Sequence, residues 1–133
     1  MNNLKLPLIF VCLAVVGRAD DKLNFFESKI RPVLAEKCYS CHSKKAAEAG
    51  KLKGDFYIDM REGLLRGGES GPAVIPGQPE KSLLMQVIRH EIIDMQMPPK
   101  KAKLTDQQIA NFETWIKDGL TDPRTGKPPK AHE

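Results

Sequence analysis

The stretch Cys38-Tyr39-Ser40-Cys41-His42 is the strongest indication of fold and function in this sequence. It has the pattern Cys-x-x-Cys-His, which is the attachment motif of c-type haem. At the end of a helix, two residues three positions apart lie on one side, so both thiols can form thioethers with the two vinyl groups of one porphyrin. The histidine that follows is then delivered to the iron. The motif predicts one covalent haem c on Cys38 and Cys41, with His42 as the proximal iron ligand.

Two other uses of the cysteine pair stay open at this point. A Cys38–Cys41 disulfide would suit an exported redox protein, although the thioredoxin-like motif belongs in a βαβ unit, and the sequence shows none. A zinc site would need a second pair of ligands at regular spacing. The two remaining histidines, His90 and His132, do not provide that pair.

A six-coordinate iron needs a distal ligand as well. The candidates are four methionines and one histidine: Met60, Met85, Met95, Met97 and His90. Met97 is favoured because Pro98-Pro99 make its loop rigid and remove two amide donors, and because this loop lies between two expected helices. The loop could therefore close over the haem face opposite His42, with Met95 and His90 as the alternatives. Methionine–histidine ligation raises the reduction potential and leaves no open site for a substrate.

The N-terminal segment is typical of a secretory signal peptide. Residues 6–16 form an uncharged apolar run, and Gly17-Arg18-Ala19 places small residues at the minus-three and minus-one positions of a cleavage site. We expect residues 1–19 to be removed near Ala19/Asp20, which gives a periplasmic or otherwise exported protein. The run is short for a bilayer span, so we expect no stable membrane span after cleavage; an uncleaved anchor is the alternative.

Composition limits the class of protein further. The 133 residues are 41% apolar and 29% charged, which is typical of one small soluble domain. The net charge of +4 comes from evenly mixed charges, so nucleic-acid binding is not indicated. Ten glycines, ten prolines and only 6% aromatic residues predict a loop-rich domain with a thin core. Such a domain usually needs a metal or a cofactor for stability.

The apolar periodicity predicts helices and little else. The helix over 105–119 has the strongest signals, because Thr105 and Gln108 stand in capping-box spacing and its apolar face carries Phe112 and Trp115. We expect these two rings to cross the first helix near Phe25 and Phe26. Other helices are expected over 24–41, with a capping box at Asn24 and a kink or restart at Pro32, over 60–66, with a capping box at Asp59, and over 79–90.

Several segments beside the haem motif resemble the planctomycete-type cytochrome c domain, a class I c-type cytochrome. The similar segments are 26–34, leading into the motif, 58–64, 67–72, 76–84, Met97-Pro98-Pro99 and the helix end at 115–119. The resemblance covers about residues 24–123. It implies a cytochrome c fold with His42 and Met97 as axial ligands and an origin in planctomycetes or related bacteria. In that family the domain usually opens a longer secreted protein, so a free carrier and a fragment are both open.

These observations give one expectation for the whole chain. We expect an all-α, cytochrome c-like domain over 20–122, with about three main helices and a Gly-rich loop insertion around one haem, followed by a polar tail or truncated linker over 123–133. The expected function is one-electron transfer rather than enzyme catalysis. The alternatives are an electron-delivering module of a longer secreted enzyme, and a haem sensor or enzyme with an open sixth site.

Lysines flank both proposed ligands. They are Lys44, Lys45, Lys100, Lys101 and Lys103. If both ligands are correct, these cations ring the exposed haem edge and would steer an acidic redox partner. Ordinary solvated lysines are the alternative interpretation.

Overall fold

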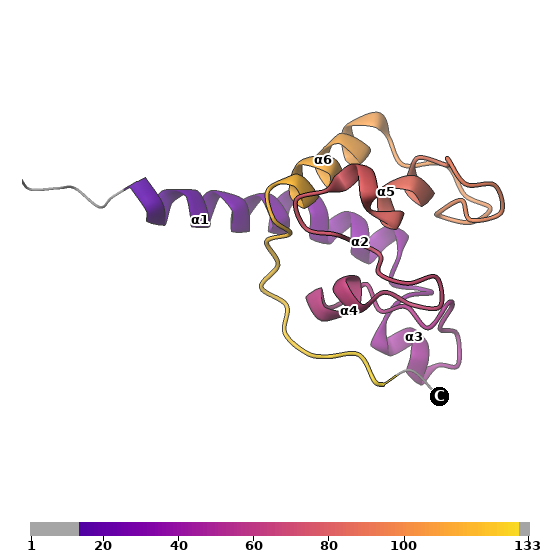
Figure 1. Cartoon of the computed structure of the whole chain (residues 1–133). Coiled ribbons are helices and arrows are strands. Elements are labelled where there is room, and N and C mark those ends of the chain that lie inside the picture. Colours follow the sequence, from indigo (N-terminus) through magenta and orange to yellow (C-terminus); the bar gives the residue numbers. More distant parts are fainter. Residues whose placement is uncertain (1–13, 131–133) are drawn as a thin grey trace, which may run out of the picture.

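The computed structural model describes residues 14–130, which fold into helices joined by long loops (Figure 1). This part of the chain contains no β-strand, only an isolated bridge between Gly68 and Gly71. The expected all-α class is therefore confirmed. In chain order the elements are α1 (Ala14–Phe25), the π-helix η1 (Phe26–Ile30), α2 (Arg31–Lys37), α3 (Lys44–Glu48), α4 (Arg61–Arg66), the 3₁₀-helix η2 (Pro79–Lys81), α5 (Leu83–Ile88) and α6 (Asp106–Lys117).

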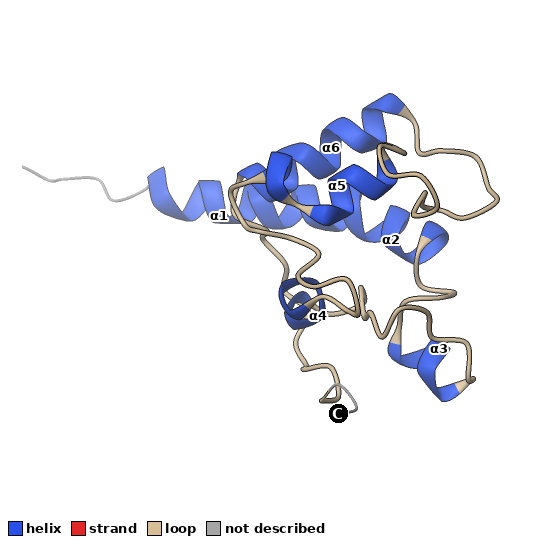
Figure 2. Cartoon of the chain, turned by 45° about the vertical axis from the view of Figure 1, so that its right-hand side comes forward, coloured by secondary structure: helices blue, strands red, loops and turns tan. Residues whose placement is uncertain are grey.

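The helices lie in two groups. α1, α2, α5 and α6 gather in the upper part of the molecule, while the short α3 and α4 lie below them among loops (Figure 2). The expected count of about three main helices is not confirmed, because the described residues form six α-helices. One of them, α3, lies outside every helix expected from the sequence.

The N-terminal helical segment runs through α1, η1 and α2. The helix already begins before Asn24, so the capping box expected there does not form, and Ser28 Oγ instead donates to the Asn24 carbonyl at 2.7 Å. The wider turn of η1 precedes Pro32, whose ring supplies no amide hydrogen. The helix restarts as α2 and ends at Lys37, before the expected end at residue 41.

The expected signal peptide falls largely on residues that the structure does not describe. Residues 1–13 lie outside the described range, and residues 14–19 form the first part of α1. In the described part of the chain, no helix has both the length and the apolar character needed to cross a membrane.

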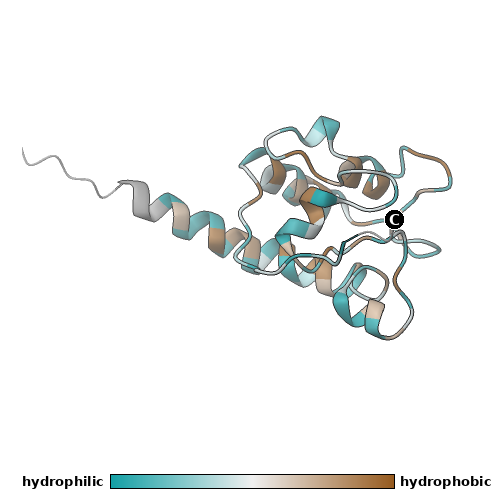
Figure 3. Cartoon of the chain, turned by 60° about the horizontal axis from the view of Figure 1, so that its bottom comes forward, coloured by the Kyte–Doolittle hydropathy of each residue, from teal (hydrophilic) through white to brown (hydrophobic). Residues whose placement is uncertain are grey.

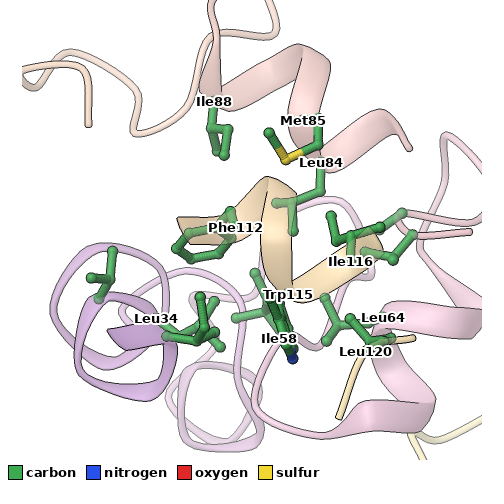
Figure 4. Packing of buried hydrophobic residues seen from close by; sticks show 14 of the residues in the cluster. Leu34, Ile58, Leu64, Leu84, Met85, Ile88, Phe112, Trp115, Ile116 and Leu120 are labelled. Carbon is green, nitrogen blue, oxygen red and sulfur yellow. The ribbon is translucent and has the colours of Figure 1, made fainter. Parts of the chain in front are cut away.

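The core forms where α6 packs on η1. The expected capping box begins α6: Thr105 Oγ1 accepts from the Gln108 amide at 3.1 Å, and Gln108 Oε1 accepts from the Thr105 amide at 2.9 Å. The Trp115 ring lies 5.6 Å from that of Phe26 and 5.8 Å from that of Phe112. The expected crossing of the two helices at these aromatic residues is confirmed. Leu84, Met85 and Ile88 of α5 pack against the other side of α6 (Figure 4).

Two expected helix starts differ from the structure. Asp59 does not cap α4, whose N-cap is Met60; its Oδ2 instead accepts from the Lys44 amide at 2.9 Å, at the start of α3. The expected helix over 79–90 is divided into η2 and α5 at Ser82. The buried Ser82 Oγ accepts from the Ile75 amide at 3.0 Å and donates to the Gln78 carbonyl at 2.9 Å, which ties the chain into a turn here.

The segment after α6 has no helix, yet it packs against the domain. It runs down the side of the molecule past α4 (Figure 1). Hydrophilic and hydrophobic residues are interspersed along the helices of the domain (Figure 3). The side chain of Arg124 is buried and pairs with the buried Asp122 carboxylate at 2.6 Å. Its guanidinium also donates to Tyr39 Oη at 2.8 Å and to the Ile58 carbonyl at 2.7 Å. Arg124 therefore belongs to the folded domain, although it lies beyond the expected boundary at residue 122.

This buried ion pair leads to a stability prediction. Arg124→Ala leaves the Asp122 carboxylate buried without its partner, so we expect a loss of about 3–5 kcal/mol in the free energy of unfolding. A urea titration of the haem-loaded protein, followed by circular dichroism, measures this loss. Glu113→Gln is the control, because it breaks the more exposed pair between Glu113 and Arg89 and should cost at most about 1 kcal/mol. Equal losses in the two variants would contradict the assignment.

Candidate functional site

One large cleft brings the cysteine motif and the methionine loop together. It holds about 1120 Å³ of space between protein atoms, part of which is open to solvent. The cleft is lined by Cys38, Cys41 and His42 from one part of the chain and by Met95 and Met97 from another.

The structure separates the distal-ligand candidates. Both Met97 and Met95 line the cleft, so Met95 stays an alternative. Met85 is fully buried in the core and Met60 is also buried, and neither lines the cleft. His90 does not line the cleft either; its Nε2 lies 3.1 Å from the Met97 carbonyl oxygen.

The cysteine motif forms a tight turn directly after α2. The amides of Cys41 and His42 both donate to the Cys38 carbonyl, at 3.2 and 3.0 Å. The turn thus replaces the expected last helical turn and still brings both cysteines to the cleft. The thiols of Cys38 and Cys41 are not joined to each other. Burial raises the pKa of the Cys38 thiol to about 12, with a smaller contribution from nearby Cys41.

A second chain segment, residues 53–58, holds the motif in place. The Lys53 amide donates to the Cys41 carbonyl at 2.9 Å, and the Ile58 amide donates to the His42 carbonyl at 2.9 Å. His42 Nδ1 lies 3.1 Å from the Lys53 carbonyl oxygen, which can only accept, so Nδ1 carries the hydrogen. Nε2 of His42 is then the ring nitrogen that can bind a metal.

The surroundings of His42 favour its neutral form. Burial lowers the pKa of the His42 imidazole, an effect partly offset by the hydrogen bonds that the ring donates to the backbone at Lys53 and Phe56. The Phe56 ring packs against the imidazole, with the ring centroids 5.2 Å apart. A neutral imidazole of fixed tautomer and orientation is the form that ligates iron.

The walls of the cleft are mainly apolar. Aliphatic side chains come from α5, from the segments before and after α4 and from the loop before α6; they include Ile58, Ala73, Leu84, Val87, Ile88 and Leu104. An apolar cleft with two thiols, one oriented imidazole and two thioethers fits a covalent haem. Among the described residues no group of three or more His, Cys, Asp or Glu could hold a metal ion by itself.

The charged residues that line the cleft differ from those expected. Of the five flanking lysines, only Lys101 lines it, whereas Lys44 and Lys45 are exposed on α3. Lys37 and Lys53 line the cleft instead, and Glu69 contributes one carboxylate. Lys37 directly precedes Cys38 in the sequence, whereas the spacing could not find Lys53, because the folding of residues 53–58 onto the motif is what brings Lys53 to the cleft.

One comparison with known protein families gives a match. Residues 38–101 match the family model described as Planctomycete cytochrome C. The matched range begins at Cys38 and includes His42 and Met97. A search of curated proteins and a search of solved structures give no match.

The glycine-rich loop opposite the motif has a structural role that can be tested. A Cβ at Gly68 would lie 2.1 Å from the Gly54 carbonyl oxygen, so the loop packs directly on the segment that holds His42. Gly68→Ala should therefore lower the free energy of unfolding by about 1–3 kcal/mol through overpacking and should reduce the yield of haem-loaded protein.

Gly50→Ala is the matched control for this change. Its added Cβ meets nothing within 4 Å, but its φ of +69° is unfavourable for alanine, so it should cost about 1–2 kcal/mol without affecting haem loading. Urea titration and the haem-to-protein absorbance ratio measure both quantities. Normal haem loading in Gly68→Ala would show that the close approach is unimportant to the site.

Proposed function

We propose that this protein is an exported mono-haem cytochrome that transfers single electrons, because residues 38–101 match the family model described as Planctomycete cytochrome C. In this proposal Cys38 and Cys41 hold the haem, and His42 and Met97 are the axial ligands. The family match supports a haem-binding electron-transfer domain. The proposal goes beyond that match in the ligand assignment, the single haem and the periplasmic location.

One observation supports the ligand assignment above all others. The cysteine pair, an imidazole with its Nε2 free and the Met97 side chain share one apolar cleft, although His42 and Met97 lie 55 positions apart in the sequence. A thiol adds across a vinyl group without a leaving group, so the two cysteines are sufficient to anchor one porphyrin. Bound haem supplies the ferric/ferrous couple.

The protein side chains have three tasks in this function. His42 is kept neutral and oriented by the Lys53 carbonyl. The apolar walls would exclude water and hold the haem plate. Together with methionine ligation, this apolar environment favours a raised reduction potential. The loop that carries Met97 closes the remaining face. With both axial positions taken, the protein works as an electron carrier, and we propose no catalytic base.

The redox partner we propose is a protein with an acidic surface. Lys37, Lys53 and Lys101 line the cleft from three separate parts of the chain. Cations gathered at the opening of the cleft raise the rate of encounter with an acidic partner more than its final affinity.

Optical spectroscopy of the haem-loaded protein tests the ligation. We expect a low-spin spectrum with the near-infrared methionine–iron charge-transfer band, and we expect Met97→Ala to abolish that band. Met95→Ala is the matched control, because it removes a methionine that lines the same cleft and should leave the band in place. The reduced wild type should resist carbon monoxide, whereas reduced Met97→Ala should bind it.

The opposite results would replace the proposal with another function. If the band is lost in Met95→Ala and kept in Met97→Ala, the distal ligand is Met95. A high-spin wild type that binds carbon monoxide has an open sixth site, and the sensor or enzyme interpretation would take precedence.

Charge variants test the partner. Neutralising Lys37, Lys53 and Lys101 to glutamine should lower the second-order rate of electron transfer with an acidic redox protein at low salt, by roughly tenfold. Neutralising Lys44 and Lys45, which do not line the cleft, should have little effect. The wild-type rate should fall as salt is added, since screening weakens steering. A rate independent of salt would contradict an acidic partner.

A further inference from the structure

We propose that His90 is a positioning residue that holds Met97 over the cleft through a hydrogen bond from its ring to the Met97 carbonyl. The inference rests on the proposed function, since it concerns the control of the proposed distal ligand. His90 itself makes no contact with the cleft and acts through the backbone of Met97.

Met97 is attached at two points to the end of α5. Its amide donates to the Val87 carbonyl at 3.0 Å, and its carbonyl oxygen lies 3.1 Å from His90 Nε2. A carbonyl oxygen only accepts, so His90 Nε2 carries the hydrogen. The next two residues, Pro98 and Pro99, have no amide hydrogen to donate. The two contacts from α5 therefore supply the hydrogen bonds that fix the backbone of Met97.

The backbone at His90 indicates that the ring matters. α5 ends in a Schellman motif, in which the Glu91 amide donates to the Gln86 carbonyl at 2.9 Å and the His90 amide to the Val87 carbonyl at 3.2 Å. His90 occupies the left-handed position of this motif, with φ of 60°. Glycine fits that position without steric cost. Helix termination alone would favour glycine, so the histidine contributes something other than the turn, and its hydrogen bond to Met97 is that contribution.

The same contact argues against His90 as the distal ligand. Its Nε2 is used by the Met97 carbonyl, and the residue does not line the cleft. In this proposal His90 acts on the distal side of the haem through the loop that carries Met97, not as a ligand of the iron.

Two variants separate the ring's hydrogen bond from the backbone requirement. Asparagine tolerates a positive φ but its amide is too short to reach the Met97 carbonyl, whereas glutamine carries its amide nitrogen as many bonds from Cα as His90 Nε2. In the haem-loaded full chain, His90→Asn should speed hydrogen exchange at the Met97 amide by roughly 2- to 10-fold. It should raise the affinity of the ferric protein for imidazole, which competes with methionine, by a similar factor. His90→Gln should restore both values toward those of the wild type.

The outcomes distinguish this inference from the proposed function. Unchanged exchange and unchanged imidazole affinity in His90→Asn overturn the role of His90, even where Met97→Ala abolishes the near-infrared band. Faster exchange with unchanged imidazole affinity also overturns it, because the bond then orders the loop without affecting the ligand. If Met97→Ala keeps the band, the proposed ligation has failed, and exchange at the Met97 amide still reports whether the hydrogen bond exists.

Discussion

The hydrogen bonds between residues 53–58 and the cysteine motif are the constraint on which the site depends. Three of them join the two segments, at the Cys41 carbonyl, the His42 carbonyl and His42 Nδ1. They determine which ring nitrogen of His42 faces the cleft, and they bring Phe56 and Ile58 to its wall. The glycine loop at Gly68 packs on the same segment. Backbone groups supply all three of these contacts to the motif.

The two proposed axial ligands are held in different ways. His42 lies in a turn fixed by its own backbone and by residues 53–58. Met97 lies in a long loop attached to the end of α5 through one amide and one carbonyl. Fewer contacts fix the methionine side, so that side can be displaced more easily by a competing ligand, while the histidine side keeps its geometry.

The haem also fits the composition of the chain. The core around Phe26, Phe112 and Trp115 extends to the wall of the cleft, because apolar side chains such as Leu84 and Ile88 belong to the core and also line the cleft. A bound porphyrin would cover these side chains and extend the core, which is how a loop-rich domain with few aromatic residues gains stability. The buried ion pair of Arg124 and Asp122 stabilises the C-terminal segment, and the Arg124 guanidinium connects that segment to Tyr39 in the cysteine motif.

The sequence by itself determined the elements that carry a side-chain signature. The Cys-x-x-Cys-His spacing, the methionine before two prolines, the capping box at Thr105 and the aromatic face of α6 all depend on residue types at fixed short intervals. Tertiary structure alone decided the partner of His42 Nδ1, the position of Lys53 at the cleft, the attachment of Arg124 to Tyr39 and the contact from His90 to Met97. The physical reason is that these contacts use backbone groups, which every residue has, or join segments far apart in the chain. Short-range spacing therefore leaves no record of them.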